Sequence, residues 1–221
     1  MVMAAPRVTP QEAWDALVEG NQRFIQDTLL HPQQGAARRK ELSSGQAPNA
    51  AFLGCSDSRV AAEILFDSGL GELFVLRNIG QISNDNTTAT MEFAVAELGV
   101  AVIVVLAHCS CGAVAAAIDQ SSAAPATVTP AIKRELEEIR PAVQQEWLST
   151  HRDTPYVDPA KIDADAVGRR HLAATINTLM RSSRVISDAV ATGALGLVGC
   201  QYQLEEGRVA PVLSVGKVDL G

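Results

Sequence analysis

The chain has 221 residues, a formal net charge of −7 at pH 7 and an isoelectric point near 5.1. This length favours one domain, or one domain with arms, and the acidic charge balance disfavours nucleic acids and anionic membranes as main partners. No apolar run reaches the roughly 18 residues that a membrane span requires, and the N-terminus lacks the apolar region of a signal peptide. We therefore expect a cytoplasmic protein.

Hydrophobic residues make up 47% of the chain but aromatic residues only 4%, so the core is expected to be aliphatic. Slim aliphatic side chains suit parallel strands that helices cover on both faces. The chain also has four cysteines, Cys55, Cys109, Cys111 and Cys200. In a cytosolic protein, metal binding or catalysis is a better interpretation of these cysteines than two disulfides.

The N-terminal segment is predicted to be a helical arm. Residues 9–12 have the sequence of a capping box, with proline at the first helical position. Apolar residues then recur at helical spacing from Trp14 to Ile25, and the helix is expected to end near Asp27. A polar connector follows, with a short helix over residues 36–42.

Short apolar strands then alternate with helical segments. Strands are predicted over 50–55, 72–78 and 100–108, and helices over 61–71, 87–98 and 112–120. The strand at 100–108 is apolar on both faces, which places it at the centre of a sheet.

Towards the C-terminus, apolar positions from Ile132 to Trp147 predict a helix with a kink at Pro141. Apolar positions from Leu172 to Val190 predict one long helix, which Gly193 terminates. Two last strands, 195–204 and 208–215, are joined by the hairpin signal "EEG".

This alternation predicts an α/β fold with a mostly parallel central sheet, about four parallel strands plus an antiparallel edge strand, flanked by helices. We expect a single domain over residues 1–221, made of an N-terminal helical arm and connector at 1–48 and an α/β core at 49–221. Sites in such sheets form at the carboxyl ends of strands, and Cys55 and His108 each lie at such an end.

Cys55 together with the H-x-x-C motif of His108 and Cys111 suits zinc, because two thiolates and one imidazole are ligands that this metal prefers. Cys111 lies near the start of a predicted helix, whose N-terminus favours the thiolate. Three protein ligands are typical of a catalytic zinc that keeps water in the fourth position. Two alternatives stay open: a structural zinc with Asp57 or Cys109 as the fourth ligand, and four cysteines that bind no metal.

Asp57 and Arg59 follow Cys55 closely, and in an extended segment their side chains share one face. A charge-assisted pair with Arg59 would hold Asp57 as an anion that accepts a hydrogen bond from a zinc-bound hydroxide. Without that arginine, the carboxylate could move onto the metal and expel the water. The alternative is an ordinary surface ion pair.

The blocks "CSDSRV", "VLRNIGQ", "TMEFAVAELGV" and "VVLAHCSCGAV" resemble β-class carbonic anhydrases, the actinobacterial members in particular. The order and spacing of these blocks agree from about Trp14 to about Gln203. The resemblance implies zinc ligands at Cys55, His108 and Cys111.

The resemblance also makes Asp57 and Arg59 the catalytic dyad, with Asp57 a fourth zinc ligand only in a closed, inactive state. It places Gln46 at the substrate and matches Gly112 to the position whose backbone N–H contacts bound anions. The "RN" block at 77–78 matches residues that shape the floor of the site and the dimer contact.

The implied reaction is the reversible hydration of carbon dioxide to bicarbonate and a proton by a zinc lyase, with zinc-bound hydroxide as the nucleophile. Two thiolates cancel the charge of zinc, so its water should be acidified less than at a three-histidine site. We therefore expect activity to rise on the alkaline side of neutral, with Asp57 displacing the water at lower pH. Alternatives are carbon disulfide or carbonyl sulfide hydrolysis on the same site, and a non-catalytic, zinc-stabilised bicarbonate-binding protein.

The remaining cysteines and histidines are expected to take no part in the chemistry. Cys109 departs from the family pattern and is interpreted as a buried, inert thiol, and Cys200 as a core strand residue. His171 and His151 are expected at the surface, with proton relay as the alternative.

The N-terminal arm is amphipathic and should pack on its own domain or on a neighbour. In the family such arms wrap a partner subunit, sheets join across a dimer, and the active site lies at that interface. The resemblance thus implies a homodimer or a dimer of dimers that acts on carbon dioxide and bicarbonate, with neither nucleic acid nor membrane as a partner.

Overall fold

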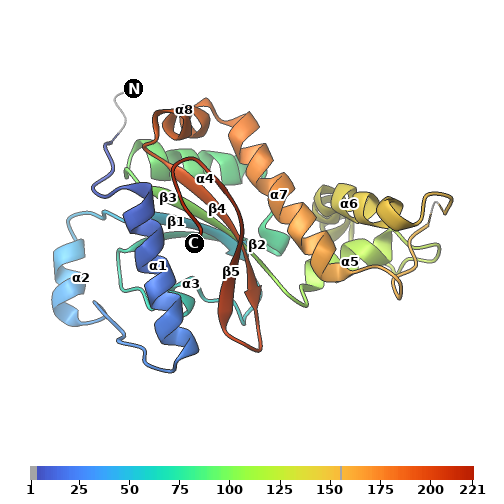
Figure 1. Ribbon diagram of the computed structural model, residues 1–221, viewed down its shortest axis with the longest axis horizontal. Helices are drawn as coiled ribbons and strands as arrows, with labels where there is room; N and C mark the ends of the chain where they lie inside the picture. The colour runs from blue at the N-terminus through green and yellow to red at the C-terminus, as the bar shows by residue number, and fades with distance from the viewer. Residues whose placement is uncertain (1–3, 155) are drawn as a thin grey trace.

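A computed structural model describes residues 4–154 and 156–221. Its core is one five-stranded sheet of β1 Ala50–Cys55, β2 Leu73–Asn78, β3 Val102–His108, β4 Gly196–Gln203 and β5 Arg208–Val215. The order across the sheet is β2-β1-β3-β4-β5 (Figure 1). The first four strands are parallel and β5 runs antiparallel to β4, which confirms the predicted fold class.

Helices cover both faces of the sheet. They are α1 Pro10–Ile25, α2 Ala36–Leu42, α3 Ala62–Leu65, α4 Asp85–Ala96, α5 Gly112–Gln120, α6 Pro130–Thr150, α7 Ala164–Ser182 and α8 Arg184–Thr192, with a 3-10 turn η1 at Ile79–Gln81. One face packs against α1 and α3 and the other against α4, α7 and α8, while α5 and α6 project to one side (Figure 1). Within the described ranges, no helix has the length and apolar character needed to cross a membrane.

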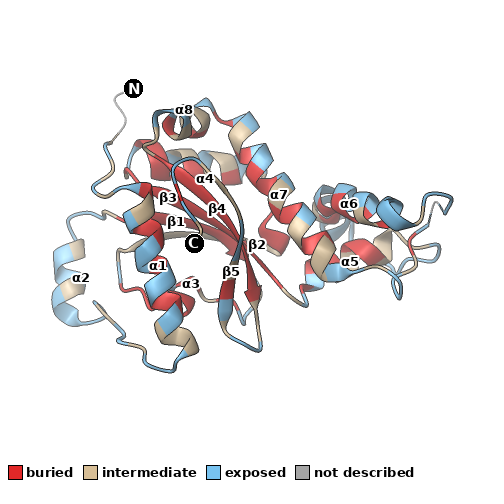
Figure 2. Cartoon of the chain, in the orientation of Figure 1, coloured by how far each residue is buried: buried red, intermediate tan, exposed pale blue. Residues whose placement is uncertain are grey.

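The sheet is buried on both faces because successive side chains of a strand point to opposite sides. In β1, Phe52 packs in the cluster beneath α1, whereas Leu53 packs in the cluster beneath α4 and α7. Val104 and Ile103 of β3 repeat this alternation. Every residue of β3 is buried (Figure 2), which confirms its central position.

Several helix boundaries differ from those predicted. The helix expected over 61–71 is only α3, which ends at Leu65. The chain turns at Asp67, whose backbone is left-handed (φ 44). The single long helix expected over 172–190 is two helices, α7 and α8. Ser183 between them is extended (φ −125, ψ 116), and its side chain accepts the N–H of Ile186 to cap α8. The helix predicted from apolar positions between Ile132 and Trp147 is α6, which begins at Pro130 and ends at Thr150 with Pro141 inside it.

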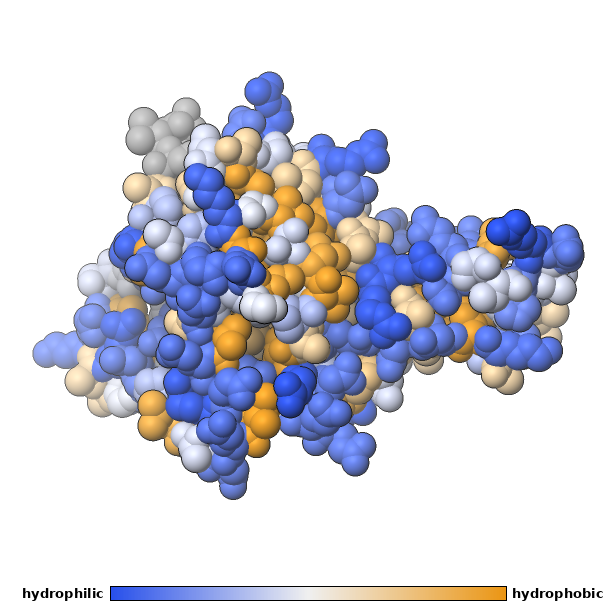
Figure 3. Space-filling view, in the orientation of Figure 1, coloured by the Kyte–Doolittle hydropathy of each residue, from blue (hydrophilic) through white to orange (hydrophobic). Residues whose placement is uncertain are grey.

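The arm packs on its own domain. The predicted capping box at the start of α1 is present. Trp14 and Leu17 are 2% and 5% exposed and lie in the same cluster as Phe52. The outer surface of α1, α2 and α6 is mainly hydrophilic, and apolar side chains on this side of the molecule gather between β5 and α7 (Figure 3).

Asn21 anchors α1 to two other elements. Its Nδ2 donates to the carbonyl oxygens of Leu65, at 3.0 Å, and Gly207, at 2.9 Å. Its Oδ1 accepts the backbone N–H of Val209 at 2.9 Å. The buried amide of Asn21 therefore ties the arm to α3 and to the β4–β5 hairpin.

Replacing Asn21 with alanine is expected to destabilise the fold, because two carbonyl groups and one amide lose their partner. Each such group costs about 1–3 kcal/mol, so the free energy of unfolding should fall by about 3 kcal/mol or more. Urea unfolding followed by circular dichroism measures the loss. Gln22→Ala changes the exposed neighbour on the same helix and should alter stability by less than about 0.5 kcal/mol. Equal stability of the two variants would contradict the anchoring role.

Candidate metal centre

Three side chains that could hold a metal ion converge at the carboxyl ends of two neighbouring strands. Cys55 is the last residue of β1, and His108 is the last residue of β3, which pairs with β1. Cys111 caps the N-terminus of α5. Their ligand atoms all lie within 4.8 Å of one another, and the residues are only 2–6% exposed. The structure thus brings together the set that the motifs indicate.

The imidazole of His108 presents a bare nitrogen to this cluster. Its Nδ1 lies 2.9 Å from the carbonyl oxygen of Cys109. A carbonyl only accepts, so Nδ1 carries a proton, and in the neutral imidazole Nε2 keeps its lone pair. Nε2 is buried and has no hydrogen-bond partner among the described residues. Burial lowers the pKa of His108, but the ionised form of Cys55 and the Cys109 carbonyl outweigh burial and raise it. A buried lone pair beside two thiols is an arrangement that zinc fits.

The thiols of Cys55 and Cys111 shift the pKa values of each other in opposite directions. The hydrogen bond from Cys111 lowers the pKa of Cys55 to about 4, against the effect of burial. The contact with Cys55, together with burial, raises the pKa of Cys111. The amides of Ala113 and Val114 at the start of α5 lower the pKa of Cys111, as expected of a helix N-terminus, but the ionised Cys55 outweighs them. Cys55 is therefore the thiol of the pair that ionises more readily.

Asp57 and Arg59 form a bidentate ion pair at the rim of the cluster. Arg59 donates from Nε to Oδ1 at 2.9 Å, from Nη2 to Oδ2 at 2.7 Å, and from its backbone N–H to Oδ1 at 2.9 Å. The side-chain hydrogen bond from Arg59 holds the pKa of Asp57 well below its ordinary value. Asp57 Oδ2 lies 3.9 Å from Nε2 of His108. The carboxylate thus borders the three ligands without belonging to the cluster.

Arg77 of β2 fixes the turn that carries Cys55 and Asp57. Its Nε donates to the carbonyl oxygen of Cys55 at 2.9 Å, and its Nη2 donates to that of Asp57 at 2.5 Å. The side chain of Asn78 binds both the backbone N–H and the carbonyl oxygen of Ile82 at 2.8 Å. The "RN" block therefore supports the site from the neighbouring strand.

Of the two residues expected at the substrate, Gly112 lies next to the Cys55, His108 and Cys111 cluster and Gln46 does not. Gly112 opens α5 beside Cys111, and a Cβ on it would meet no atom within 4 Å, so open space lies next to it. Gln46 is exposed in the connector that leads to the amino end of β1, whereas Cys55 stands at the carboxyl end. A strand of this length spans about 20 Å. The structure therefore does not bring Gln46 to the ligands of its own chain.

Two residues near the site were not predicted from the sequence. Ser110 has a left-handed backbone (φ 53), and its carbonyl oxygen accepts from Arg59 at 3.3 Å; nothing in the sequence marks it. The prediction that His171 lies at the surface is wrong, because it is 3% exposed and its Nε2 lies 2.8 Å from the carbonyl oxygen of Gly80. Its helical spacing from Leu179 on the buried face of α7 is the signal that identifies it.

The other cysteines and His151 lie outside the cluster. Cys109 is half-buried rather than buried, and its sulfur accepts the backbone N–H of Leu204 at 3.2 Å. Cys200 is buried in β4, and burial raises its pKa. His151 stacks on Trp147 with ring centres 3.8 Å apart. These contacts account for the three residues structurally.

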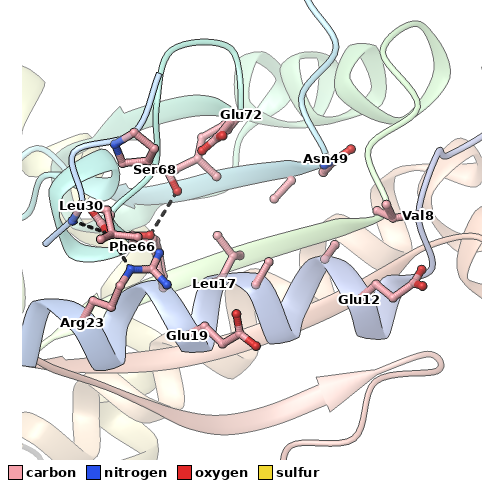
Figure 4. Close-up of a pocket in the computed structure, with 16 residues that line it drawn as sticks. Val8, Glu12, Leu17, Glu19, Arg23, Leu30, Asn49, Phe66, Ser68 and Glu72 are labelled. Carbon is pink, nitrogen blue, oxygen red and sulfur yellow. Dashed lines mark hydrogen bonds and ion pairs between the residues drawn. The ribbon is translucent and has the colours of Figure 1, made fainter. Parts of the chain in front are cut away.

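A cavity of about 350 Å³ lies between α1 and the amino ends of β1 and β2, and none of the three ligands lines it (Figure 4). Arg23 on its wall pairs with Asp67, with Nε 2.6 Å from Oδ2. Asp67 also accepts the backbone N–H groups of Leu30 and His31 at 3.0 Å. These polar groups satisfy one another and hold the connector against α1.

Comparison with known proteins indicates one family. A family model described as carbonic anhydrase matches residues 50–209. Carbonic anhydrase 2 of Mycobacterium tuberculosis is 39% identical over 96% of this chain and 98% of that protein. The carbonic anhydrase of Mycolicibacterium smegmatis is 38% identical over 92% of this chain and 94% of that protein. A tetrameric β-carbonic anhydrase from Sordaria macrospora shares the fold, with a TM-score of 0.70 at 22% identity over 93% of this chain and 100% of that chain.

The chain therefore belongs to the β-class carbonic anhydrase family and is an enzyme of that family. The mycobacterial relatives confirm the resemblance to actinobacterial members. The Cys55, His108 and Cys111 cluster lies within the matched region.

Zinc content should follow the three converging residues. The purified protein is expected to hold about one zinc per chain. Cys55→Ala, His108→Ala or Cys111→Ala should lose the metal, because each would remove one of the three expected ligands. Elemental analysis by mass spectrometry, referred to protein concentration, measures this. Cys109→Ala and Cys200→Ala remove thiols outside the cluster and should keep the zinc. Loss of zinc from Cys109→Ala with full retention in Cys111→Ala would show that the ligand set is wrong.

Proposed function

We propose that the protein catalyses the reversible hydration of carbon dioxide to bicarbonate and a proton. The observation that carries the proposal is the bidentate pair of Asp57 and Arg59 beside a buried Cys/His/Cys cluster, in a chain of this family. The donor set favours zinc, which two thiolates and an imidazole suit. When bound, zinc supplies a water of lowered pKa, and hence a hydroxide nucleophile near neutral pH.

Asp57 and Arg59 control the space next to the ligands. Both oxygens of Asp57 accept from Arg59, so the carboxylate is held at the rim instead of moving into the open ligand position. A carboxylate oxygen can accept more than one hydrogen bond. With zinc bound, Asp57 would therefore accept one further hydrogen bond from the hydroxide nucleophile and orient its lone pair towards the substrate. Released from Arg59, the same carboxylate would close the site.

The start of α5 provides room and positive potential for the product. No side chain fills the space beside Gly112. Amides at a helix N-terminus carry partial positive charge and favour anions. The Gly112 N–H is therefore suited to an oxygen of bicarbonate.

The charge of the ligands sets the pH range of activity. Cys55 and Cys111 contribute two negative charges as thiolates, which offset the charge of a divalent cation, and such a centre acidifies water less than one of three neutral histidines. We therefore expect turnover to rise above neutral pH. Asp57 does not set this rise, because Arg59 holds its pKa low and it stays ionised throughout the range.

We also propose that the enzyme works in the cytoplasm. All four cysteines are free, and two of them must stay reduced to bind zinc. A reducing compartment keeps thiols in that state.

Arg59→Ala should lower carbon dioxide hydration by about 100-fold or more while zinc content stays unchanged. Without the guanidinium, Asp57 is free to occupy the open ligand position. Stopped-flow hydration with a pH indicator measures the rate. Arg140→Ala, which removes an exposed arginine paired with Glu137 on α6, should keep full activity.

Two outcomes would contradict this role of Arg59. Full activity of Arg59→Ala would make the pair an ordinary surface ion pair. Loss of zinc together with activity would make it a structural support of the metal.

We propose that two copies join along β2, at one edge of the sheet. All six residues of β2 are half-buried, and an unpaired edge strand with apolar side chains favours association. Phe93 of α4 stacks on Phe74 of β2, with ring centres 6.1 Å apart, and is itself 48% exposed. The opposite edge, β5, carries Pro211, which cannot donate to another strand. Tetramers of the Sordaria macrospora relative are consistent with paired dimers.

Such a dimer also gives Gln46 a role. If a two-fold axis perpendicular to the sheet relates the two copies, their β2 strands run antiparallel. The amino end of one β2 then lies beside the carboxyl end of the partner's β2. Gln46 lies towards the amino ends of the strands, so it would approach the partner's metal site. This explains how a residue far from its own ligands can contact substrate.

Light scattering of the purified protein should give a dimer or a dimer of dimers. Phe93→Glu places a charge in the proposed interface and should raise the dissociation constant about 10-fold or more. Leu148→Glu, at a similarly exposed apolar position on α6 (49%), should leave association unchanged. A stable, active monomer of the unaltered chain would refute this assembly.

A further inference from the structure

The turn after β2 has two consecutive left-handed residues. Gly80 has φ 68 and ψ 24, and Gln81 has φ 46. A Cβ at Gly80 would lie 2.9 Å from Cδ1 of Ile139 and 3.1 Å from Cβ of Ala113, so the position favours glycine. Gln81 is not glycine, and this backbone conformation is unfavourable for it. The surroundings must therefore hold the turn in place.

Two side chains of α7 provide that support. Nε2 of His171 lies 2.8 Å from the carbonyl oxygen of Gly80, and the hydroxyl of Thr175 donates to the carbonyl of Gln81 at 3.4 Å. Because a carbonyl only accepts, Nε2 of His171 carries the proton and donates it. Burial lowers the pKa of His171, so the imidazole is neutral. His171 is thus a fixed hydrogen-bond donor and not a proton relay.

The other side of Gly80 faces the metal centre. A hydrogen bond from the Gly80 backbone is one of the contacts that lower the pKa of the Cys55 thiol. Gly80 also approaches Ala113, which follows Cys111 in the first turn of α5. Cys55 pairs with Asn78 across β1 and β2, which fixes the turn relative to the ligand. Gly80 therefore links α7 to the surroundings of both thiols.

We propose that His171 is a positioning residue for the metal centre, because its hydrogen bond to the Gly80 carbonyl fixes the peptide groups on both sides of Gly80 and directs the Gly80 N–H at the sulfur of Cys55. The inference rests on the zinc function proposed above. Hydrogen bonds from outer groups orient metal ligands and tune how much charge a sulfur donates. Loss of the His171 contact would let the turn relax, and Cys55 would donate more charge to the cation.

A matched pair of variants separates this hydrogen bond from packing. His171→Gln keeps an N–H that can reach the Gly80 carbonyl, whereas His171→Met has nearly the same length and no donor. Each protein is loaded with Co²⁺, whose thiolate-to-metal absorption band reports the charge donated by sulfur. Zinc affinity is measured in parallel by competition with a chelator.

His171→Met should shift the cobalt band and weaken zinc binding about 10-fold or more, whereas His171→Gln should stay close to the unaltered chain. Ile176→Ala, farther along α7 and packed in the cluster on the sheet, controls for lost stability and should leave both readouts unchanged. Identical bands and affinities for the Met and Gln variants would overturn the inference and leave the zinc function standing. An unaltered chain that binds neither metal would overturn the zinc function itself.

A measurement on the unaltered chain covers the case in which His171→Met does not fold. In isotope-labelled protein loaded with NMR-active cadmium, the Gly80 amide proton should show scalar coupling to the metal through the sulfur of Cys55. Absence of that coupling in a folded, cadmium-loaded protein would overturn the inference.

Discussion

The clamp of Arg59 on both oxygens of Asp57 is the interaction on which the proposed chemistry of this protein depends. Two thiolates and an imidazole leave a tetrahedral metal with one open position. Asp57, with Oδ2 3.9 Å from Nε2 of His108, is the acid at the rim of that position. In the proposed function, the guanidinium separates a centre open to solvent from one closed by the protein's own carboxylate. It also lowers the pKa of that carboxyl and so favours its ionised form.

The parallel sheet gives this clamp a rigid base. Cys55 and His108 end two adjacent strands whose residues are buried on both faces, so neither can shift without disturbing the core. Arg77 binds the turn after β1 from the next strand, and Cys111 is fixed at the start of α5. Side chains held on regular elements and supported by outer hydrogen bonds keep the geometry that catalysis needs. His171, on the far side of the turn, extends that support by one more layer.

The sequence is informative where one physical signal dominates. The apolar runs of β1 and β3 end at Cys55 and His108, and the known direction of parallel strands is enough to bring these two residues together. Helical spacing continues unbroken across Ser183, so the division into α7 and α8 depends on a capping hydrogen bond that the pattern does not reveal. His171 is stabilised by the carbonyl of Gly80, 91 residues away in the chain, and no local pattern predicts such a partner. Long-range polar contacts are thus the part of the site that local sequence patterns do not predict.

The most direct test of this metal centre is zinc content measured beside stopped-flow carbon dioxide hydration at two pH values, one below and one above neutral. We expect about one zinc per chain at both pH values and faster hydration at the higher one. A folded chain without zinc, or a zinc-loaded chain whose kcat/KM is the same at both pH values, would contradict a thiolate-rich centre with one position open to solvent.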